Sequence, residues 1–557
     1  MTQTPPALLE HRIREHPDAC ALIDGPPERP RRYSYHEFGR LGERAAAWFA
    51  ARGIVAGDRV ALWMVNRAEW LAVYFGLLRL GAAVVAVNTR YRAPELQHLL
   101  ALSRARMLVT EPGFRGIDFP ALIDELDGAR LPDFESVAIL REPQAGASAS
   151  SASSVSSAAR LPQRLAGRPV FLIDAAGSAD TGDSGDSGES APPDRSEADA
   201  PATFYTTSGT TKGPKLVTHL QRTMAGHALD VAQRLGFDRG DARLAAMMPL
   251  CGTFGLTAVL GALVGGTPTV LVDAFDPVQT TRLLRDHRIT HAFWTDDMLR
   301  RLAAQADGDR PFPDARLFGF AAFGPGAGEL AETLWARGIP AHGLYGSSEV
   351  HALFAIQPTA LPIAERVRGG GRPMSVATRV RVRDVESGEL LPAGRSGELE
   401  FASPNNFAGY FDNPAATAQA ITEDGFFRTG DVGQLRADGT FVYQNRGDDS
   451  IRLSGFLVDP AEIEDPIKTL PGVADVQVVA IEIAGRQRAV AFVIPADGQA
   501  PDPEALIAAA AGLMAPYRTP ARVWLVDAFP TTAGPNGTKI QRGRLREMAR
   551  ARIAAEG

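Results

Sequence analysis

One run of the sequence is rich in the residue types that bind phosphate. Residues 205–217 read YTTSGTTKGPKLV and hold two of the chain's four lysines, Lys212 and Lys215, among 58 basic residues in all. A lysine ammonium is a compact charge that reaches a single oxygen, whereas guanidinium is a wide planar fork. Backbone N–H groups, hydroxyls and ammonium groups in such a run form a nest for phosphate oxygens. The run lacks the Lys–Ser/Thr ending of the GxxxxGK[ST] loop, so it favours phosphate binding over a plain polar turn without naming the phosphate.

Short motifs with carboxylate, aromatic and basic residues follow this run. YGSSE occupies residues 345–349, TGD occupies 429–431, RGDD occupies 446–449, SGF occupies 454–456, and NGTKI occupies 536–540. Each motif alone is compatible with a turn cap, a surface helix, a salt bridge or a solvated charge. Ionised carboxylates accept hydrogen bonds from hydroxyls and hold Mg²⁺.

In this order the motifs resemble those of the adenylate-forming enzymes, which include acyl-CoA synthetases, the adenylation domains of nonribosomal peptide synthetases, and luciferases. The glycine-rich run is similar to the family pattern [ST]SGTTGxPKG, and the later motifs resemble YGxTE, TGD, the hinge segment and the C-terminal NGK. The resemblance spans nearly the whole chain. It implies activation of a carboxylic acid by ATP and Mg²⁺, followed by transfer to coenzyme A.

The resemblance implies particular contacts with the nucleotide. The phosphate contacts would be Thr207, Ser208, Gly209, Thr210, Thr211 and Lys215. Tyr345, beside Gly346, would stack on adenine. Asp431 would accept the two ribose hydroxyls, and Arg446 would add a donor to the same ribose.

The resemblance also implies residues for the reaction itself. Glu349 would be the Mg²⁺ ligand, and Ser348, in place of the family's threonine, would donate to the α-phosphate. Lys539 would bridge the acyl carboxylate and the α-phosphate. Asp448 matches the hinge about which the C-terminal domain swings between the two steps. Gly455 would then let the pantetheine arm of coenzyme A pass close to the backbone.

The chain departs from the family pattern at places that bear on the substrate. Lys212 stands where the family has glycine, and it either leans into solvent or touches pyrophosphate. Residues 249–255, PLCGTFG, resemble PLFHxFG, with Gly252 in place of a bulky residue. No aspartate lies there to pair with an amino group, so a fatty or aromatic acid is expected. The expected acyl pocket includes Gly252, Thr253, Phe254 and Phe323.

The helices and strands predicted around these residues are typical of an α/β fold. Apolar spacing predicts helices over 36–52 and 67–80 and strands over 59–65 and 82–87, a parallel βαβ pattern. Asp276 before Pro277 predicts the start of another helix, and Asp296 is a candidate cap for the next. We predict an N-terminal domain of parallel-sheet subdomains over 1–446 and a mobile α+β domain over 447–557. An Ala/Ser/Gly-rich insertion over 143–200 is too poor in apolar residues to order itself, except for a short piece expected to be ordered at 170–173.

Bulk composition excludes several classes. A net charge of −7 argues against a nucleic-acid surface, and the two cysteines suit a reducing cytosol. The N-terminus lacks a signal-like apolar region and no apolar run is long enough to span a membrane, so we expect a cytoplasmic monomer or homodimer. No carrier domain is expected after Lys539. Loading of a separate acyl carrier protein, and an inactive relative of the fold, stay open as alternatives to acyl-CoA synthesis.

Overall fold

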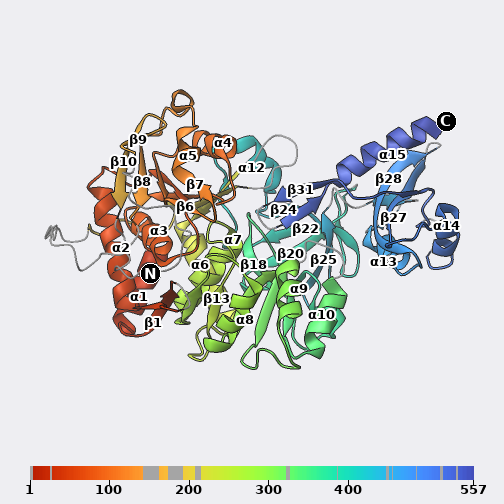
Figure 1. Cartoon of the computed structure of the whole chain (residues 1–557), viewed down its shortest axis with the longest axis horizontal. Helices are drawn as coiled ribbons and strands as arrows, with labels where there is room; N and C mark the ends of the chain where they lie inside the picture. Colours follow the sequence, from red (N-terminus) through yellow and green to blue (C-terminus); the bar gives the residue numbers. More distant parts are fainter. Residues whose placement is uncertain are drawn as a thin grey trace.

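The structure is a computed structural model that describes residues 4–556, apart from 26–27, 142–161, 174–191, 207–214, 322–326, 386, 447–450, 454–455, 459, 484–485, 515–517 and 535–536. Two large sheets with helices around them form most of the molecule, and a smaller C-terminal unit lies at one end (Figure 1). This confirms the predicted α/β class with a small C-terminal α+β unit.

The first sheet has nine strands and contains the βαβ pattern predicted near the N-terminus. Its strands are β3 (Arg59–Trp63), β4 (Ala83–Ala86), β5 (Met107–Thr110), β8 (Ser136–Leu140), β9 (Arg164–Leu165), β10 (Arg168–Ile173), β11 (Pro201–Thr206), β12 (Leu216–Leu220) and β23 (Gly409–Tyr410). Their order is β23-β12-β11-β4-β3-β5-β8-β10-β9. Neighbours from β11 to β10 are parallel, whereas β12, β23 and β9 pair antiparallel.

Helices α2 (Tyr35–Ala50) and α3 (Ala68–Arg79) pack on each other and on this sheet. The side chain of Ser34 accepts from the backbone of Glu37 while the Glu37 carboxylate accepts from the backbone of Ser34, a reciprocal cap that fixes the start of α2. A Cβ on Gly76 would lie 2.8 Å from the nitrogen of Ala46, so the close contact of the two helices requires glycine. The predicted helices and strands are confirmed here, with ends shifted by one or two residues.

The insertion predicted over 143–200 contains the ordered piece expected at 170–173, and the fold also includes residues at its C-terminal end. Residues 168–173 form β10, which pairs parallel with β8 in the main sheet. Residues near 195 also belong to the fold, since Arg195 donates its backbone N–H to the carbonyl of Arg79 and Ser196 bonds Thr4. The parts of the insertion that remain, 142–161 and 174–191, lie outside the described residues.

The second sheet has 14 strands. They are β1 (Cys20–Asp24), β2 (Arg31–Ser34), β13 (Leu244–Ala246), β14 (Thr269–Leu271), β15 (His291–Thr295), β16 (Leu317–Ala321), β17 (Ala341–Ser347), β18 (His351–Ile356), β19 (Gly370–Pro373), β20 (Arg379–Arg383), β21 (Leu390–Leu391), β22 (Ser396–Ala402), β24 (Phe427–Leu435) and β25 (Phe441–Arg446). The order is β2-β1-β14-β13-β15-β16-β17-β18-β19-β25-β24-β22-β20-β21. A parallel block from β1 to β17 is continued by antiparallel strands from β18 onward.

The remaining helices before residue 447 surround these sheets. They are α1 (Pro5–Glu15), α4 (Ala93–Ser103), α5 (Phe119–Asp124), α6 (Gln221–Leu235), α7 (Thr253–Gly265), α8 (Pro277–Asp286), α9 (Asp296–Gln305), α10 (Ala327–Ala336), α11 (Ile363–Arg366) and α12 (Pro414–Ala420). The Asp276 carboxylate caps α8, as predicted, by accepting from the backbone of Gln279 at 2.8 Å. The predicted cap of α9 is wrong by one residue, because Thr295 accepts from the backbone of Met298 and Asp296 is already helical.

The C-terminal unit has its own core. Its elements are β26 (Ile451–Leu453), β27 (Phe456–Val458), α13 (Ala461–Lys468), β28 (Val473–Ile483), β29 (Arg486–Pro495), α14 (Pro503–Ala511), β30 (Val523–Leu525), β31 (Thr531–Gly534), β32 (Gly537–Ile540) and α15 (Arg542–Glu556). The sheet β28-β29-β30 contributes residues to two apolar clusters. The predicted boundary at 446/447 adjoins residues 447–450, which are not described, so the boundary stays a prediction.

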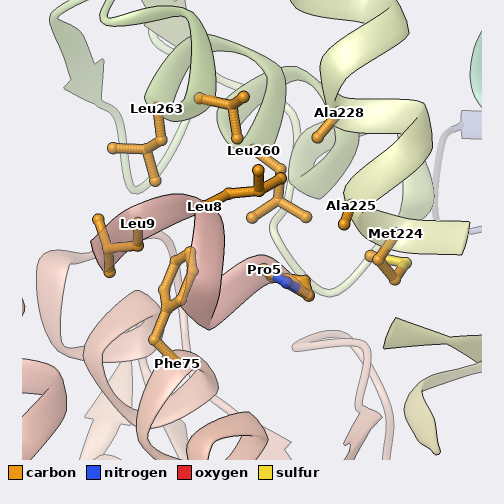
Figure 2. Close-up of a pocket in the computed structure, with 10 residues that line it drawn as sticks. Pro5, Leu8, Leu9, Phe75, Met224, Ala225, Ala228, Leu260 and Leu263 are labelled. Carbon is orange, nitrogen blue, oxygen red and sulfur yellow. The ribbon is translucent and has the colours of Figure 1, made fainter. Parts of the chain in front are cut away.

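An apolar hollow lies between α1, α3, α6 and α7. Figure 2 shows Leu8, Leu9, Phe75 and Leu260 around it, and Met224, Ala225 and Ala228 line it from α6. Such a lining offers no partner to a carboxylate or phosphate. None of the helices in the described ranges combines the length and apolar character needed to cross a membrane.

Candidate active site

Three predicted site residues meet on the second sheet, and we call them the Asp431 corner: Tyr345 of β17, Asp431 of β24 and Arg446 of β25. Asp431 lies opposite Arg446 in the strand register. Its carboxylate accepts from the Tyr345 hydroxyl at 2.6 Å and from Nη1 of Arg446 at 2.7 Å. Charge-assisted bonds of this length fix the carboxylate strongly. Each oxygen of Asp431 therefore has one partner in the fold.

The TGD motif has a structural reason for each residue. The Thr429 hydroxyl donates to the carbonyl of Leu399 at 2.7 Å and accepts from the backbone N–H of Asp431 at 2.9 Å. Gly430 has a φ of +68°, a left-handed conformation that glycine adopts without strain. The turn of the chain at Gly430 aims Asp431 at Tyr345.

Tyr345 lies in an aromatic cluster with only 6% of its surface exposed. Its ring contacts those of Phe401, Phe441 and Tyr443 at centroid distances of 5.2–5.6 Å. Burial, and next the charge of Asp431, raise the pKa of Tyr345 well above its ordinary value. The hydroxyl therefore stays a donor to Asp431, and stacking of this ring on adenine stays a prediction.

Arg446 and Asp431 stabilise each other as charges. Burial lowers the pKa of Arg446, but the neighbouring Asp431 carboxylate more than offsets this, so that the pKa is raised overall. The Tyr345 oxygen and the Glu349 carboxylate contribute in the same direction. Glu349 therefore lies within electrostatic reach of the Asp431 corner.

Glu349 lies in the turn between β17 and β18, residues 347–352, which we call the Glu349 turn. Its half-buried carboxylate accepts from the Tyr410 hydroxyl at 3.1 Å, and its backbone carbonyl accepts from the N–H of Phe407 at 2.8 Å. Burial, and next the charge of Glu349, raise the pKa of Tyr410. Gly346 lets the turn close, because a Cβ there would lie 2.6 Å from the Cα of Ala352.

Lys215 joins the end of the glycine-rich run to this turn. Its ammonium lies 4.6 Å from the centroid of the Tyr410 ring, and its side chain is exposed. The pairing of β12 with β23, with Val217 opposite Tyr410, brings the two segments together. A cation over an aromatic face is attracted by the ring's quadrupole. The Lys215 ammonium thus lies beside the Tyr410 ring, and the Tyr410 hydroxyl donates to the Glu349 carboxylate.

The donor set around Glu349 fits a magnesium site completed by phosphate. Mg²⁺ usually keeps several waters and takes one or two carboxylates plus substrate phosphates. Glu349 supplies one half-buried carboxylate, and in the described ranges no group of three or more His, Cys, Asp or Glu residues is arranged to hold a metal by itself. A magnesium ion in this site would depend on the nucleotide for its other ligands.

The residues expected at the acyl pocket lie at the start of α7, in the segment 249–255, which we call the Gly252 segment. Gly252, Thr253 and Phe254 are all partly exposed. The buried amide of Asn66 fixes the chain leading there, since its Oδ1 accepts from the backbone of Leu250 at 2.8 Å and its Nδ2 donates to the carbonyl of Met248 at 2.9 Å.

Two glycines of the Gly252 segment differ in the space around them. A Cβ on Gly252 would meet only the carbonyl oxygen of Pro249, at 3.6 Å. A Cβ on Gly255 would lie 2.2 Å from that same oxygen and 2.4 Å from the carbonyl oxygen of Met248. Among the described residues, then, no neighbour fills the space at Gly252, whereas Gly255 is required by a backbone contact.

Several predicted residues lie outside the described residues. They are Thr207, Ser208, Gly209, Thr210, Thr211, Phe323, Asp448 and Gly455. Lys539 lies on β32, opposite Thr532 in the hairpin with β31, and only its backbone is described. The roles assigned to these residues stay predictions.

Sequence reasoning missed three kinds of residue that the structure brings to the site. Tyr410 bonds Glu349, Asn66 fixes the Gly252 segment, and His219 on β12 contacts the Glu349 turn. Nothing in the sequence near Tyr410 or Asn66 points to chemistry. His219 lies two residues beyond the glycine-rich run, so its place at the end of that run is a signal that could have been used.

Comparisons with known proteins agree with this geometry. The family model for AMP-binding enzymes matches residues 9–411, and the model for their C-terminal domain matches residues 462–534. Over 546 residues the chain is 30% identical to 3-hydroxybenzoate–CoA ligase of Aromatoleum sp. (strain CIB), covering 96% of this chain and 94% of that one. It is 28% identical over 550 residues to 2-succinylbenzoate–CoA ligase of Geobacillus kaustophilus (strain HTA426), covering 98% of both.

A solved structure also matches along nearly its whole length. ATP-bound MatB from Rhodopseudomonas palustris superposes with a TM-score of 0.78 at 25% identity, covering 98% of this chain and 99% of that chain. The motifs, the fold and the family models agree over both the large part of the chain and its C-terminal unit. The chain belongs to the AMP-binding enzyme family.

Proposed function

We propose that this protein is an AMP-forming acid–thiol ligase that activates an apolar carboxylic acid with ATP and transfers the acyl group to coenzyme A. The observation that carries the proposal is a pair of held carboxylates, Asp431 bonded by Tyr345 and Arg446, and Glu349 bonded by Tyr410, whose ring lies beside Lys215. Each oxygen of the Asp431 carboxylate has one partner and can accept a further hydrogen bond, which suits ribose hydroxyls. A lysine and a second carboxylate nearby suit a metal-bound polyphosphate.

In the first step of this proposal, an oxygen of the acid attacks the α-phosphorus of ATP. The bond from that phosphorus to the pyrophosphate oxygen breaks, and pyrophosphate leaves. Lys215 offsets charge on the leaving phosphates, Glu349 is the carboxylate that would hold Mg²⁺, and Lys539 stabilises the two approaching anions. Mg²⁺, when bound, supplies further neutralisation of the phosphate charge.

In the second step, the thiol sulfur of coenzyme A attacks the carbonyl carbon of the acyl-adenylate. The bond from that carbon to the bridging oxygen breaks, AMP leaves with the oxygen, and the thiol proton passes to solvent. Rotation of the C-terminal unit about Asp448, with Gly455 beside the pantetheine arm, is part of the proposal. Both residues lie outside the described part of the chain.

The acid is proposed to be apolar, and aromatic acids are the first to test. The space beside Gly252 is open, and Phe254 lies next to it with its ring 5.9 Å from that of Phe293. Two of the relatives described above are named for benzoate-type acids, which contain an aromatic ring. Fatty acids remain the alternative, and the acid panel below separates the two.

The test of this proposal is AMP release from ATP–Mg²⁺ with a panel of aromatic and straight-chain acids, each with and without coenzyme A. We expect AMP release that requires both one acid class and coenzyme A. Acid-dependent pyrophosphate exchange without any response to coenzyme A would favour a carrier protein as acceptor. No turnover with any acid would contradict the proposal.

Lys539→Ala separates the two half-reactions. Loss of one preorganised charge typically costs about 10²–10³ in rate, and we expect that loss in adenylation with little change in thioester formation from supplied acyl-adenylate. Lys468→Ala is the matched control, because Lys468 lies on α13 of the same unit and pairs with Asp475 at 3.2 Å. An equal loss in both half-reactions contradicts the role of Lys539.

A further inference from the structure

Three buried histidine rings form a stack beside the Glu349 turn, although none of them is used in the proposed reaction. His351, the first residue of β18, is sandwiched between His219 of β12 and His227 of α6. Its ring centroid lies 3.8 Å from that of His219, at an interplanar angle of 28°, and 4.5 Å from that of His227, at 9°. No more than 3% of any of the three residues is exposed. We call this set the histidine stack.

The two outer rings hold both ends of the turn. Nε2 of His219 donates to the carbonyl of Ser348 at 2.7 Å, and Nε2 of His227 donates to the carbonyl of Ala352 at 3.0 Å. A carbonyl only accepts, so in both histidines the hydrogen lies on Nε2. The residues joined by these bonds are more than 120 apart in the sequence. The stack therefore ties β12 and α6 to the turn that carries Ser348 and Glu349.

The middle ring has a different role. Neither ring nitrogen of His351 makes a hydrogen bond of normal geometry within the described structure, although backbone groups of Asn405 and Thr223 lie near it. A buried polar group without a partner is costly, so its place needs a compensating reason. Ring-on-ring contact on both faces supplies one, because it fills the space between His219 and His227 and sets their separation.

The backbone of the turn is strained where the stack meets it. His351 has a φ of +67° and Leu353 a φ of +57°, both in the left-handed region. Histidine tolerates this region moderately well, but leucine rarely adopts it. Residues in such conformations persist only where their surroundings over-determine them, and they cluster at functional sites. The bond from His219 lies before this strained stretch, at Ser348, and the bond from His227 lies within it, at Ala352.

We infer that the histidine stack positions the Glu349 turn for adenylation, with His219 and His227 as positioning residues and His351 as the spacer between them. This inference rests on the proposed function of the site. The stack acts on the reaction only through the places of Ser348 and Glu349. Its loss is expected to slow adenylation more than it weakens binding of the acid, whose proposed pocket begins at Gly252.

The experiment compares variants that keep or remove the Nε2 donor. His219→Leu and His227→Leu keep an apolar filling and lose the donor, whereas His219→Gln and His227→Gln retain an amide N–H at similar reach. Loss of such an orienting partner typically costs about 10–100-fold in activity or metal affinity. We expect the Leu variants to lower kcat of acid-dependent pyrophosphate exchange by that factor at an unchanged KM for the acid, and the Gln variants to recover most of it.

His291→Leu is the matched control for burial alone. His291 on β15 is 5% exposed and burial lowers its pKa to about 4, but its ring bonds Thr290 and contacts Phe237 rather than the Glu349 turn. We expect this variant to lose thermal stability with kcat per folded molecule unchanged. Each rate is therefore divided by the folded fraction, measured by thermal unfolding of the same sample.

The outcomes separate the inference from the proposed function. If wild-type enzyme is active and the Leu variants behave like His291→Leu, or the Gln variants do no better than Leu, the inference is overturned and the function stands. If wild-type enzyme shows no pyrophosphate exchange with any acid of the panel, the proposed function is wrong. The affinity for ATP–Mg²⁺, measured by calorimetry on the same variants, then decides the inference, and equal affinities overturn it.

Discussion

Around Asp431 each carboxylate oxygen has a partner, Arg446 from the neighbouring strand β25 and Tyr345 from β17, whereas the Gly252 segment presents open space and a backbone fixed from one side by Asn66. The Asp431 corner and the Glu349 turn are joined to the sheets by charged bonds and stacked rings. The Gly252 segment is held by the side-chain amide of Asn66 and by the close backbone contact at Gly255. Under the proposed function, the nucleotide side is therefore the more heavily bonded of the two, and the acid side has space at Gly252.

If buried histidines hold the nucleotide side, lowering the pH should decrease the stability of the folded protein. Unfolded histidine has a pKa near 6.5, while burial lowers the pKa of His219 and of His227 to about 4 in the folded chain. Between these values the unfolded state binds more protons, so stability is lost as the pH falls from about 6.5 to about 4. The loss is about 3 kcal/mol for each such histidine.

Urea unfolding at a series of pH values between 7 and 5 measures this slope. His291 and His342, whose pKa values burial also lowers to about 4, contribute to the wild-type slope. His227→Gln removes one titrating group from the stack and should give a shallower dependence. A slope that stays as steep in this variant would contradict the account of the stack.

Asp431→Asn tests the Asp431 corner directly. The amide cannot accept from both Tyr345 and Arg446, and it leaves the guanidinium without its counter-charge. Hydrogen bonds to charged groups contribute about 1.5–3 kcal/mol, so kcat/KM for ATP should fall by about 10–100-fold. Asp438→Asn is the control, since Asp438 precedes β25, is largely exposed and bonds only local groups and the distant Arg372. Equal kinetics in the two variants would show that the corner does not bind nucleotide.

Gly252→Leu tests the acid side and should have the smallest effect on the fold. Gly252 caps α7 with a φ of −109°, which any residue adopts, and a Cβ there meets no close atom among the described residues. We expect kcat/KM for bulky acids to fall by about 10-fold or more relative to small acids, with kcat/KM for ATP little changed. Gly255→Ala, whose Cβ would overlap two backbone carbonyls, should instead destabilise the protein by about 1–3 kcal/mol. An equal loss of kcat/KM for all acids in Gly252→Leu would contradict a binding space for the acid beside Gly252.

Much of this architecture is readable from the sequence where the signal is local. The Asp276–Pro277 cap and the βαβ pattern of residues 36–87 depend on neighbours in the chain, and both are confirmed. The cap of α9 is predicted one residue too late, because Thr295 and Asp296 are both good caps and the structure uses Thr295. The motif order likewise indicated that Asp431 and Arg446 act together, and the strand register pairs them.

The rest depends on contacts between distant segments. Tyr410 reaches Glu349 only because β23 adds to the edge of β12, a pairing across about 190 residues that no local pattern encodes. The histidine stack needs three elements at once, and each histidine alone reads as an ordinary core residue. An ordered piece at 170–173 is expected from its apolar residues, but its place in the sheet as β10 depends on pairing with β8, which no local pattern shows.

The central claim is that the acid is activated as an acyl-adenylate, and the fate of one oxygen tests it most directly. The acid is labelled with ¹⁸O in its carboxylate, the enzyme turns it over with ATP–Mg²⁺ and coenzyme A, and the AMP is analysed by mass spectrometry. The account predicts one ¹⁸O atom in each AMP and none in pyrophosphate, because the bond from the carbonyl carbon to the bridging oxygen breaks in the second step. Unlabelled AMP, or label in inorganic phosphate with ADP as product, would contradict it.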